Sequence, residues 1–228
     1  MENMNDLLSS LRRPERIGPD AMLLPGFALE EAESLIKQIM LIAREAPFRR
    51  LHTPGGRALS AEMTNCGILG WHSDRAGYRY ESSDPLSGKP WPVMPPLFRR
   101  LAQRAAQHAG HTGFDPQACL INRYATGARM GLHQDRDEEA LDAPIVSVSL
   151  GVPAKFLFGG MHRSDLTQSF TLEHGDVVVW GGASRLFYHG VAPIKAAMHS
   201  LTGALRYNLT FRRIRHAIRP MPKVDLPS

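Results

Sequence analysis

The sequence predicts a mainly β fold with helices packed against its outside. From Ala118 onward, short runs of β-branched and aromatic residues are separated by turn residues, and helical periodicity is absent. The N-terminal half instead carries two apolar stripes at helical spacing. The 20 glycines and 17 prolines are 37 of 228 residues, or about 16%, which exceeds the usual share of about 12% and favours many turns. Regularly spaced short strands are typical of a sandwich, a jelly roll or a barrel.

Two amphipathic helices are expected before these strands. The first spans residues 29–46, where apolar side chains recur every three or four positions and Pro47 ends the run. The second follows the Pro95-Pro96 pair and ends at Gly110. Between the helices, residues 52–92 are rich in Gly, Ser, Asp and aromatic side chains, which indicates loops and short hairpins. This segment is a candidate lid.

Seven strands joined by short turns are expected in the rest of the chain, at residues 118–124, 145–150, 155–158, 169–173, 176–180, 185–189 and 206–212. His174 and Gly175, between two of these runs, are typical of a tight hairpin turn. No strong boundary cuts the chain, so we expect a single domain. Its parts are an N-terminal extension and helix, a lid, a core of one helix and the strands, and a basic tail, at residues 1–50, 51–92, 93–213 and 214–228.

Composition excludes several classes of protein. A chain that is 43% hydrophobic and 21% charged is globular rather than disordered or fibrous. Its 2 cysteines are too few for a disulfide framework. The first twenty residues lack the apolar core of a secretory signal, and no apolar stretch reaches the ~20 residues of a membrane span, so we expect a cytoplasmic protein. The net charge of +5 favours polyanionic partners, nucleic acid first.

His133, Asp135 and His189 are candidate metal ligands. In an extended segment, residues 133 and 135 point the same way and can place an imidazole and a carboxylate on one ion. His189 ends an apolar run, and strands far apart in the chain face each other across a jelly roll. Two imidazoles and one carboxylate are the ligand set of non-haem Fe(II) oxygenases, although zinc hydrolases use a similar set. For His-x-Asp alone, an ordinary half-buried histidine is the commoner explanation.

The strand at residues 206–212 separates these two kinds of enzyme. Its polar residues, Arg206, Asn208, Thr210 and Arg212, share one face. A half-buried strand with a solvated outer face is the simpler interpretation. If that face is buried, two guanidinium groups suit a dicarboxylate, because planar arginine forks bind carboxylates bidentately. Asn122 and Tyr124 also share a face and supply further hydrogen-bonding groups, whereas a zinc hydrolase needs no such pocket.

The candidate lid carries Trp71, Tyr78 and Tyr80 among Arg75 and Arg79. Aromatic planes with basic neighbours are what stacking on an unpaired base requires. The alternative is that these rings pack onto their own domain. Other basic residues cluster at 49–57 and at 212–223, where phosphate contact and a merely solvated surface are both compatible with the pattern.

Taken together, the motifs closely resemble the AlkB family of Fe(II)- and 2-oxoglutarate-dependent dioxygenases. The resemblance runs from about Pro54 to Arg212 and includes Met63-Thr64-Asn65-Cys66-Gly67, Gly70-Trp71, Lys89-Pro90-Trp91-Pro92, Leu120-Ile121-Asn122-Arg123-Tyr124, Leu132-His133-Gln134-Asp135, the run from Glu173 to Gly182, and the run from Arg206 to Arg212. It implies a double-stranded β-helix, a jelly-roll or cupin-like core, with a nucleotide-recognition lid.

The resemblance also implies residue roles. His133, Asp135 and His189 would be the catalytic iron ligands. The co-substrate 2-oxoglutarate would be bound by the strand motifs, with Arg206 at the carboxylate near the metal and Arg212 at the distal one. The residues of these motifs are Asn122, Arg123, Tyr124, Arg206, Tyr207, Asn208, Leu209, Thr210 and Arg212.

On the substrate side, the resemblance implies that Trp71 stacks on a flipped base and that Asp137 faces its exocyclic amine. Tyr78, Arg79 and Tyr80 would lie along the phosphate backbone, and Arg163 would reach the substrate from the far rim. The chain departs from the bacterial archetype at His72-Ser73-Asp74 and at Arg57, all in the lid. Asp74 would repel phosphate and Arg57 would attract it, which bears on the preferred strand and lesion.

The activity implied is oxidative demethylation of alkylated nucleobases, such as 1-methyladenine and 3-methylcytosine. It would use Fe(II), 2-oxoglutarate and O2, with ascorbate as a reductant in vitro, and release formaldehyde, succinate and CO2. The expected partner is alkylated single-stranded DNA, with duplex DNA and RNA as alternatives, and the expected state is a monomer. A 2-oxoglutarate hydroxylase acting on modified RNA or protein is the competing enzyme, and a non-catalytic nucleic-acid-binding module is the competing class.

Overall fold

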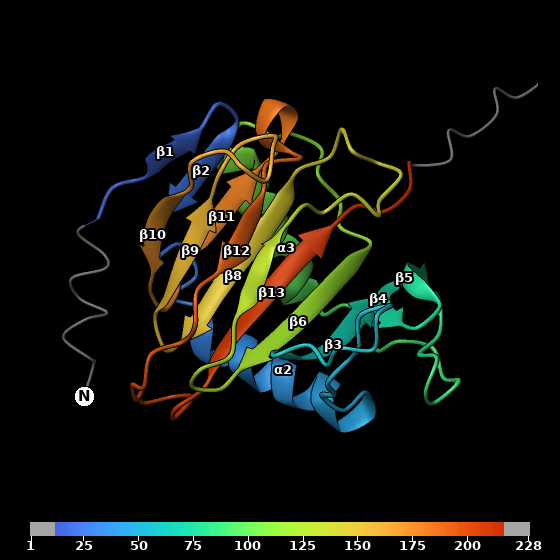
Figure 1. Ribbon diagram of the computed structural model, residues 1–228. Helices are drawn as coiled ribbons and strands as arrows, with labels where there is room; N and C mark the ends of the chain where they lie inside the picture. The colour runs from blue at the N-terminus through green and yellow to red at the C-terminus, as the bar shows by residue number, and fades with distance from the viewer. Residues whose placement is uncertain (1–11, 217–228) are drawn as a thin grey trace, which may run out of the picture.

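The computed structural model describes residues 12–216, which form two antiparallel sheets that face each other (Figure 1). The major sheet has seven strands in the order β1-β2-β11-β8-β13-β6-β3, and the minor sheet has four in the order β10-β9-β12-β7. In the major sheet the strands span Glu15–Gly18 (β1), Ala21–Leu24 (β2), Val177–Trp180 (β11), Ile145–Gly151 (β8), Arg206–Arg212 (β13), Ala118–Tyr124 (β6) and Glu62–Gly67 (β3). In the minor sheet they span Gln168–Leu172 (β10), Ala154–Phe158 (β9), His189–Val191 (β12) and Met130–His133 (β7). The jelly-roll prediction is confirmed.

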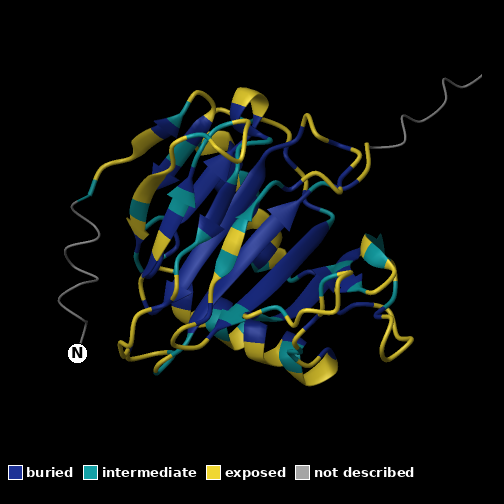
Figure 2. Ribbon diagram, viewed as in Figure 1, coloured by how far each residue is buried: buried dark blue, intermediate teal, exposed yellow. Residues whose placement is uncertain are grey.

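Helices α2 (Ala32–Glu45) and α3 (Pro96–His108) cover the outer face of the major sheet. Each buries the apolar stripe that the sequence predicted: Leu35 and Ile39 of α2 and Phe98 and Leu101 of α3 are fully buried. Burial of each such side chain contributes about 1.5–3 kcal/mol. The exposed residues of these helices lie on their outward side, and others lie in the loops and on the strands β1 and β10 (Figure 2). This packing occupies one face of the sheet and leaves the other face for the site.

Strand β13 alternates strictly between the two faces of the major sheet. Tyr207, Leu209 and Phe211 belong to the apolar core under the helices. Arg206 and Arg212 point to the inner face, yet they are only 1% and 6% exposed. The interpretation of this strand as half-buried with a solvated polar face is therefore wrong, because the minor sheet covers its polar side chains. A buried row of polar groups requires partners, and this row lines the pocket described below.

Two predicted elements differ in the structure. No strand forms over residues 185–188, where a 3₁₀ helix at Gly182–Ser184 leads into β12, which begins only at His189. The side chain of Arg185 is turned inward there and donates to the backbone oxygens of Ala143 and Asp135. His174 and Gly175 do form a turn, but not a hairpin, since β10 pairs with β9 whereas β11 pairs with β2 and β8. With Gly175 at φ +82°, this turn carries the chain from the minor sheet to the major one.

Residues 62–81 are more regular than the sequence indicated. Strand β3 joins the edge of the major sheet beside β6, and β4 (Gly70–Asp74) and β5 (Gly77–Glu81) form a separate two-stranded hairpin. In Figure 1 this hairpin lies on the opposite side of the molecule from β10. It is the central part of the predicted lid segment, and from here on the name lid refers to the hairpin alone. The short strands β1 and β2 near the N-terminus were not predicted. Most of the predicted basic tail, 217–228, lies outside the described residues.

Neither helix in residues 12–216 is long and apolar enough to cross a membrane.

Candidate active site

Three candidate metal ligands meet at one end of the space between the sheets. Strands β7 and β12 are neighbours, and His133 lies directly opposite His189 in their register. Asp135 follows β7 by two residues, and its Oδ1 and Oδ2 lie 3.6 Å and 3.8 Å from the Nε2 atoms of His133 and His189. The ligand atoms of all three residues lie within 4.8 Å of one another. No other group of three or more such residues close enough for a metal occurs within residues 12–216.

The orientation of both imidazole rings suits a metal. The Nδ1 atom of His133 lies 2.9 Å from the Gly131 carbonyl oxygen, and that of His189 lies 2.9 Å from the Phe187 carbonyl oxygen. A proton on Nδ1 would be donated to each carbonyl, which leaves the Nε2 lone pair for the ion. Burial, assisted by the nearby His133, lowers the pKa of His189 to about 4, so this ring is neutral near pH 7, as a ligand must be.

Asp135 is buried beside Arg212. Burial alone would raise the pKa of this carboxyl group, but the Arg212 guanidinium and the two imidazoles outweigh burial and hold the pKa well below its usual range. Arg212 donates to Asp135 Oδ2 from Nη2 at 2.7 Å and from Nε at 3.1 Å. Gln134, between the two ligands, points away and donates to the Leu186 carbonyl oxygen at 2.5 Å. The carboxylate is therefore ionised and held in one orientation.

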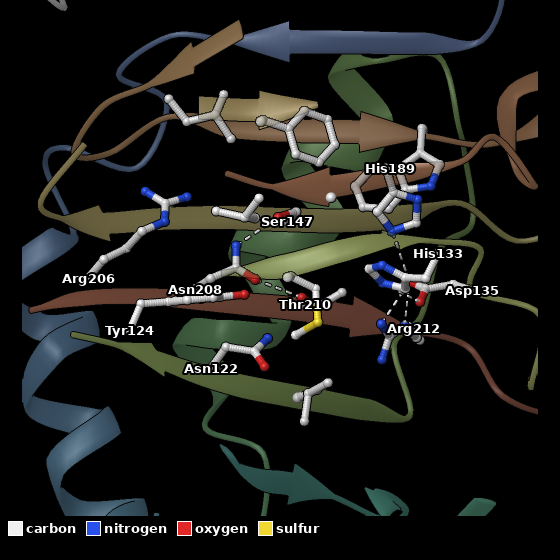
Figure 3. A pocket seen from close by; sticks show the side chains of 17 residues that line it. Asn122, Tyr124, His133, Asp135, Ser147, His189, Arg206, Asn208, Thr210 and Arg212 are labelled. Atoms are coloured by element: carbon white, nitrogen blue, oxygen red, sulfur yellow. Dashed lines mark hydrogen bonds and ion pairs between the residues drawn. The ribbon is translucent and has the colours of Figure 1, made fainter. Parts of the chain in front are cut away.

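A pocket runs from the metal ligands along the inner face of β6, β8 and β13 (Figure 3). Its polar wall includes Asn122, Tyr124, Ser147, Arg206, Asn208, Thr210 and Arg212. Its apolar wall includes Leu120, Met130, Phe156, Leu172, Trp180 and Val191. Asn208 donates to Ser147 Oγ at 2.8 Å, and Thr210 donates to Asn208 Oδ1 at 2.8 Å. This chain of hydrogen bonds fixes the middle of the polar wall.

The two arginines lie at opposite ends of the pocket, in the reverse of the predicted order. Arg212 contacts the ligand Asp135, whereas Arg206 lies at the far end beside Tyr124 and donates to Ser149 Oγ at 2.7 Å (Figure 3). The assignment of Arg206 to the metal end is therefore wrong. Strand direction explains the reversal: β13 runs toward the ligands, so its last residue, not its first, reaches them.

The polar wall fits an anionic, multiply hydrogen-bonded ligand. Among the described residues, Arg206 Nε and Asn122 Oδ1 are buried without a hydrogen-bond partner. A buried guanidinium N–H without an acceptor is costly, and a carboxylate would satisfy it. The Asn122 amide presents a donor to the same space after rotation about its last bond. Together with the His–Asp–His group, these residues fit Fe(II) and a dicarboxylate co-substrate.

Three residues of the strand motifs do not line the pocket. Tyr207 and Leu209 belong to the core under the helices, and Arg123 pairs with Glu62 and stacks over the Phe48 ring at 4.5 Å. Alternation along β6 and β13 places all three on the outer face. Ser147, which was not predicted, also lies on the inner face and lines the pocket. Its signal is present in the alternation of serine with valine over residues 146–149.

The lid brings some, but not all, of the predicted substrate residues into contact with one another. Trp71 stacks on Tyr78 with ring centroids 5.6 Å apart and donates from Nε1 to Asp137 Oδ2 at 3.2 Å. Tyr80 does not face outward toward a phosphate backbone, because its hydroxyl lies against Glu138. Arg163 is exposed on the far rim and donates to the Leu132 carbonyl oxygen at 2.8 Å.

Arg79 is likewise not free for a phosphate. It donates to both carboxylate oxygens of Asp74, at 2.8 Å and 2.9 Å, and to Glu81 at 2.7 Å. The departure at Asp74 thus occupies a predicted phosphate-binding arginine. Arg57, the other departure, has an exposed side chain.

A jelly roll with a His–Asp–His group beside a dicarboxylate pocket defines a 2-oxoglutarate-dependent Fe(II) oxygenase. Comparison with known proteins agrees: the profile of the 2OG-Fe(II) oxygenase superfamily matches residues 20–212. The alpha-ketoglutarate-dependent dioxygenase AlkB of Salmonella typhimurium is 57% identical, over 87% of this chain and 92% of its own. The chain belongs to the AlkB family of this superfamily.

Two more distant relatives support the same placement. The DNA N(6)-methyladenine demethylase ALKBH1C of Arabidopsis thaliana is 31% identical over 84% of this chain and 49% of its own. The solved structure of OsALKBH1 superposes with a TM-score of 0.76 and 30% identity, over 88% of this chain and 99% of that one.

Proposed function

We propose that this protein removes methyl groups oxidatively from alkylated nucleobases, 1-methyladenine and 3-methylcytosine among them. The observation that carries the proposal is the position of Trp71: it stacks on Tyr78, packs against the apolar cluster that contains Leu120 and Tyr124 of the pocket wall, and donates a hydrogen bond to Asp137, two residues beyond a metal ligand. An aromatic face there is suited to hold a planar base within reach of the metal. The relatives named above include a DNA demethylase, which agrees with such a substrate.

His133, Asp135 and His189 would hold Fe(II) through two imidazole nitrogens and one carboxylate, the ligand set of oxygenases that use a co-substrate and O2. Arg212 would meet the carboxylate of 2-oxoglutarate next to the metal, since it already contacts Asp135. Arg206, with Tyr124, would bind the distal carboxylate at the far end of the pocket. Asn122, Asn208 and Thr210 would hold the chain between them.

When bound, Fe(II) with 2-oxoglutarate and O2 supplies the oxidation of the N-methyl group, with formaldehyde, succinate and CO2 as products. The protein's own contribution is position and exclusion of water. Phe156 and Trp180 of the apolar wall lie beside the metal ligand His189, and Trp71 would hold the base over this end of the pocket. Asp137 would accept a hydrogen bond from the exocyclic amine that both proposed bases carry.

The test is a demethylation assay with protein reconstituted anaerobically with Fe(II). Methylated single-stranded DNA, duplex DNA, RNA and a methylated peptide are compared at one stated salt concentration. We expect formaldehyde and succinate in equal amounts, dependent on 2-oxoglutarate, with single-stranded DNA converted fastest. Faster conversion of RNA or peptide would favour the competing hydroxylase, and the absence of succinate formation would contradict any oxygenase.

We further propose that the chain acts as one dioxygenase domain and as a monomer in the cytoplasm. A methylated Watson–Crick edge is accessible in a single strand without base flipping, which supports a single-stranded substrate. One lid beside one pocket gives a complete site without a second subunit. Light scattering of the active protein checks this, since a dimer would contradict the monomeric state.

A further inference from the structure

Two aromatic side chains of the lid donate hydrogen bonds to the loop that carries Asp135. Trp71 on β4 and Tyr80 on β5 lie directly opposite each other in the hairpin. Trp71 Nε1 donates to Asp137 Oδ2 at 3.2 Å, and the Tyr80 hydroxyl donates to Glu138 Oε1 at 2.5 Å. The two acceptors follow the metal ligand by two and three residues. One cross-strand pair of the lid thus contacts the ligand loop at two points.

The Tyr80 contact is the more buried of the two. Asp137 is exposed, whereas Glu138 is only 5% exposed, accepts a hydrogen bond from Arg185 and forms an ion pair with Arg212. Arg185 Nη2 lies 3.0 Å from Glu138 Oε2, and Arg212 Nε lies 3.4 Å from Glu138 Oε1. Arg212 Nη1 in turn donates to the Tyr80 hydroxyl oxygen at 3.3 Å. The tyrosine hydroxyl therefore lies between a carboxylate and a guanidinium, with a bond to each.

The same two arginines hold the metal ligand. Arg212 donates to the Asp135 carboxylate at 2.7 Å, and Arg185 Nη1 donates to the Asp135 backbone oxygen at 2.6 Å. Two carboxylates and two guanidinium groups form a compact buried cluster of balanced charge. Such clusters depend on complete hydrogen bonding, because a buried charge that loses a partner is costly. Tyr80 is the member of this cluster that belongs to the lid.

We infer that Tyr80 is a positioning residue: its bonds to Glu138 and Arg212 fix the guanidinium that orients Asp135 and that meets 2-oxoglutarate, so the seating of the lid sets the affinity for the co-substrate. The inference rests on the proposed function, in which Arg212 contacts 2-oxoglutarate. Because coupling between two sites is reciprocal, 2-oxoglutarate also stabilises the seated lid. Lid and metal centre are thus linked through the protein, before any nucleic acid binds.

The first test measures binding without turnover. Protein loaded with Mn(II), which does not support the oxidation, is titrated calorimetrically with 2-oxoglutarate. Tyr80→Phe keeps the ring packed against Leu69, Ala118 and Ile214 and removes only the hydroxyl. We expect the affinity for 2-oxoglutarate to fall about tenfold, the size expected for a lost bond to a charged group. Tyr78→Phe is the matched control, since it removes a hydroxyl from the same strand, and we expect its affinity within about twofold of wild type.

The second test measures the coupling itself by amide hydrogen exchange. In wild type, Mn(II) and 2-oxoglutarate together should slow exchange over residues 70–81. In Tyr80→Phe this slowing should be lost, while β13 remains protected on binding. A purely structural role would instead speed exchange equally with and without ligand.

The outcomes separate the inference from the proposed function. If Tyr80→Phe binds 2-oxoglutarate like wild type, or if the ligand leaves lid exchange in wild type unchanged, the positioning role is wrong and the proposed function stands. If wild-type protein binds no 2-oxoglutarate, the proposed function fails, and the inference with it. The exchange measurement on wild type decides the question even if the variant folds poorly.

Discussion

The pocket and the lid are built in opposite ways. The pocket's polar residues lie on β13 and on its two partner strands, β6 and β8, and they are buried. In the lid, β4 and β5 pair only with each other, and Tyr78 is 48% exposed. A lone two-stranded hairpin is marginally stable by itself. The chemistry therefore depends on a rigid frame, whereas substrate recognition depends on a segment that can adjust and can vary in sequence.

Changes to the metal ligands should have the largest effect on activity. They should also differ from one another in their effect on the stability of the fold. His133→Ala and Asp135→Ala should each reduce demethylation more than about a thousandfold, because three ligands define the site. Only Asp135→Ala should also destabilise the fold, by about 3–5 kcal/mol, since it leaves buried Arg212 without its main partner. The His133 side chain is 39% exposed, so its loss should change the melting temperature little. Equal stability losses in the two variants would contradict this account.

Substitution of Arg206, at the end of the pocket far from the metal ligands, should have the second largest effect. Arg206→Lys should weaken 2-oxoglutarate binding roughly a hundredfold, because an ammonium cannot reproduce the planar fork. Arg123→Ala is the matched control: the residue lies on the outer face of the same sheet and should leave the KM for 2-oxoglutarate within about twofold. Steady-state kinetics with varied 2-oxoglutarate measures both. A large effect of Arg123→Ala would instead support the prediction that Arg123 takes part in 2-oxoglutarate binding.

Acid should lower the free energy of unfolding of the protein. Burial, with His199 nearby, lowers the pKa of His174 from 6.5 in the unfolded chain to about 4 in the folded protein. The unfolded state therefore binds the proton first, so this contribution is present above pH 6.5 and is lost as the pH falls toward 4. Its size is about 3 kcal/mol. Urea unfolding at pH 7.5 and pH 4.5 measures the loss.

His174→Asn is the control for that experiment. Its side-chain oxygen can still accept from the Gly151 N–H that Nδ1 accepts from at 2.9 Å, but it does not titrate. The variant should therefore lose less stability on acidification than wild type. An identical loss would assign the acid sensitivity elsewhere.

In the lid, Trp71→Ala should weaken binding of a methylated oligonucleotide about tenfold, the usual worth of one stacked base. Trp71→Phe keeps an aromatic face but loses the bond to Asp137, so an intermediate effect is expected. Fluorescence anisotropy at a fixed salt concentration measures both. If Trp71→Ala binds the oligonucleotide as wild type does, the base does not stack there.

The smallest effect is expected at Asp74. Asp74→Ala would release Arg79 from one of its two carboxylate partners, leaving Glu81, and would remove a negative charge from the lid. Oligonucleotide binding should then tighten by about threefold at low salt, and the gain should vanish at high salt, because exposed charges are screened. A gain that persists at high salt would point to a contact other than phosphate.

The sequence predicted the faces of the strands better than their ends. Alternation in β13 placed Arg206 and Arg212 together on one face, and the structure agrees. It could not say which arginine reaches the metal, since that depends on how the loop at Asp135 packs against the end of β13. Arg123, Tyr207 and Leu209 entered the site only as parts of matched motifs, although the same alternation turns them outward.

Long-range polar contacts were beyond any local pattern. Tyr80 and Glu138 are 58 residues apart, and nothing in either neighbourhood signals their bond. The strand predicted at 185–189 is absent from most of that range for a related reason. Its apolar residues favour a strand, but Arg185 turns inward and donates hydrogen bonds to three acceptors. Such sites become visible only once the tertiary structure brings charges together.

The ladder between β7 and β12 places two imidazoles opposite each other, and the carbonyl oxygens of Gly131 and Phe187 orient their rings before any ion binds. Because the ligand atoms of this metal site are already in place before an ion binds, binding requires no conformational change that could select one ion over another. Divalent copper and zinc generally bind nitrogen and oxygen donors more tightly than ferrous iron does. Activity in a living cell would then follow the supply of ferrous iron relative to these competitors, and excess zinc would inhibit without unfolding the protein.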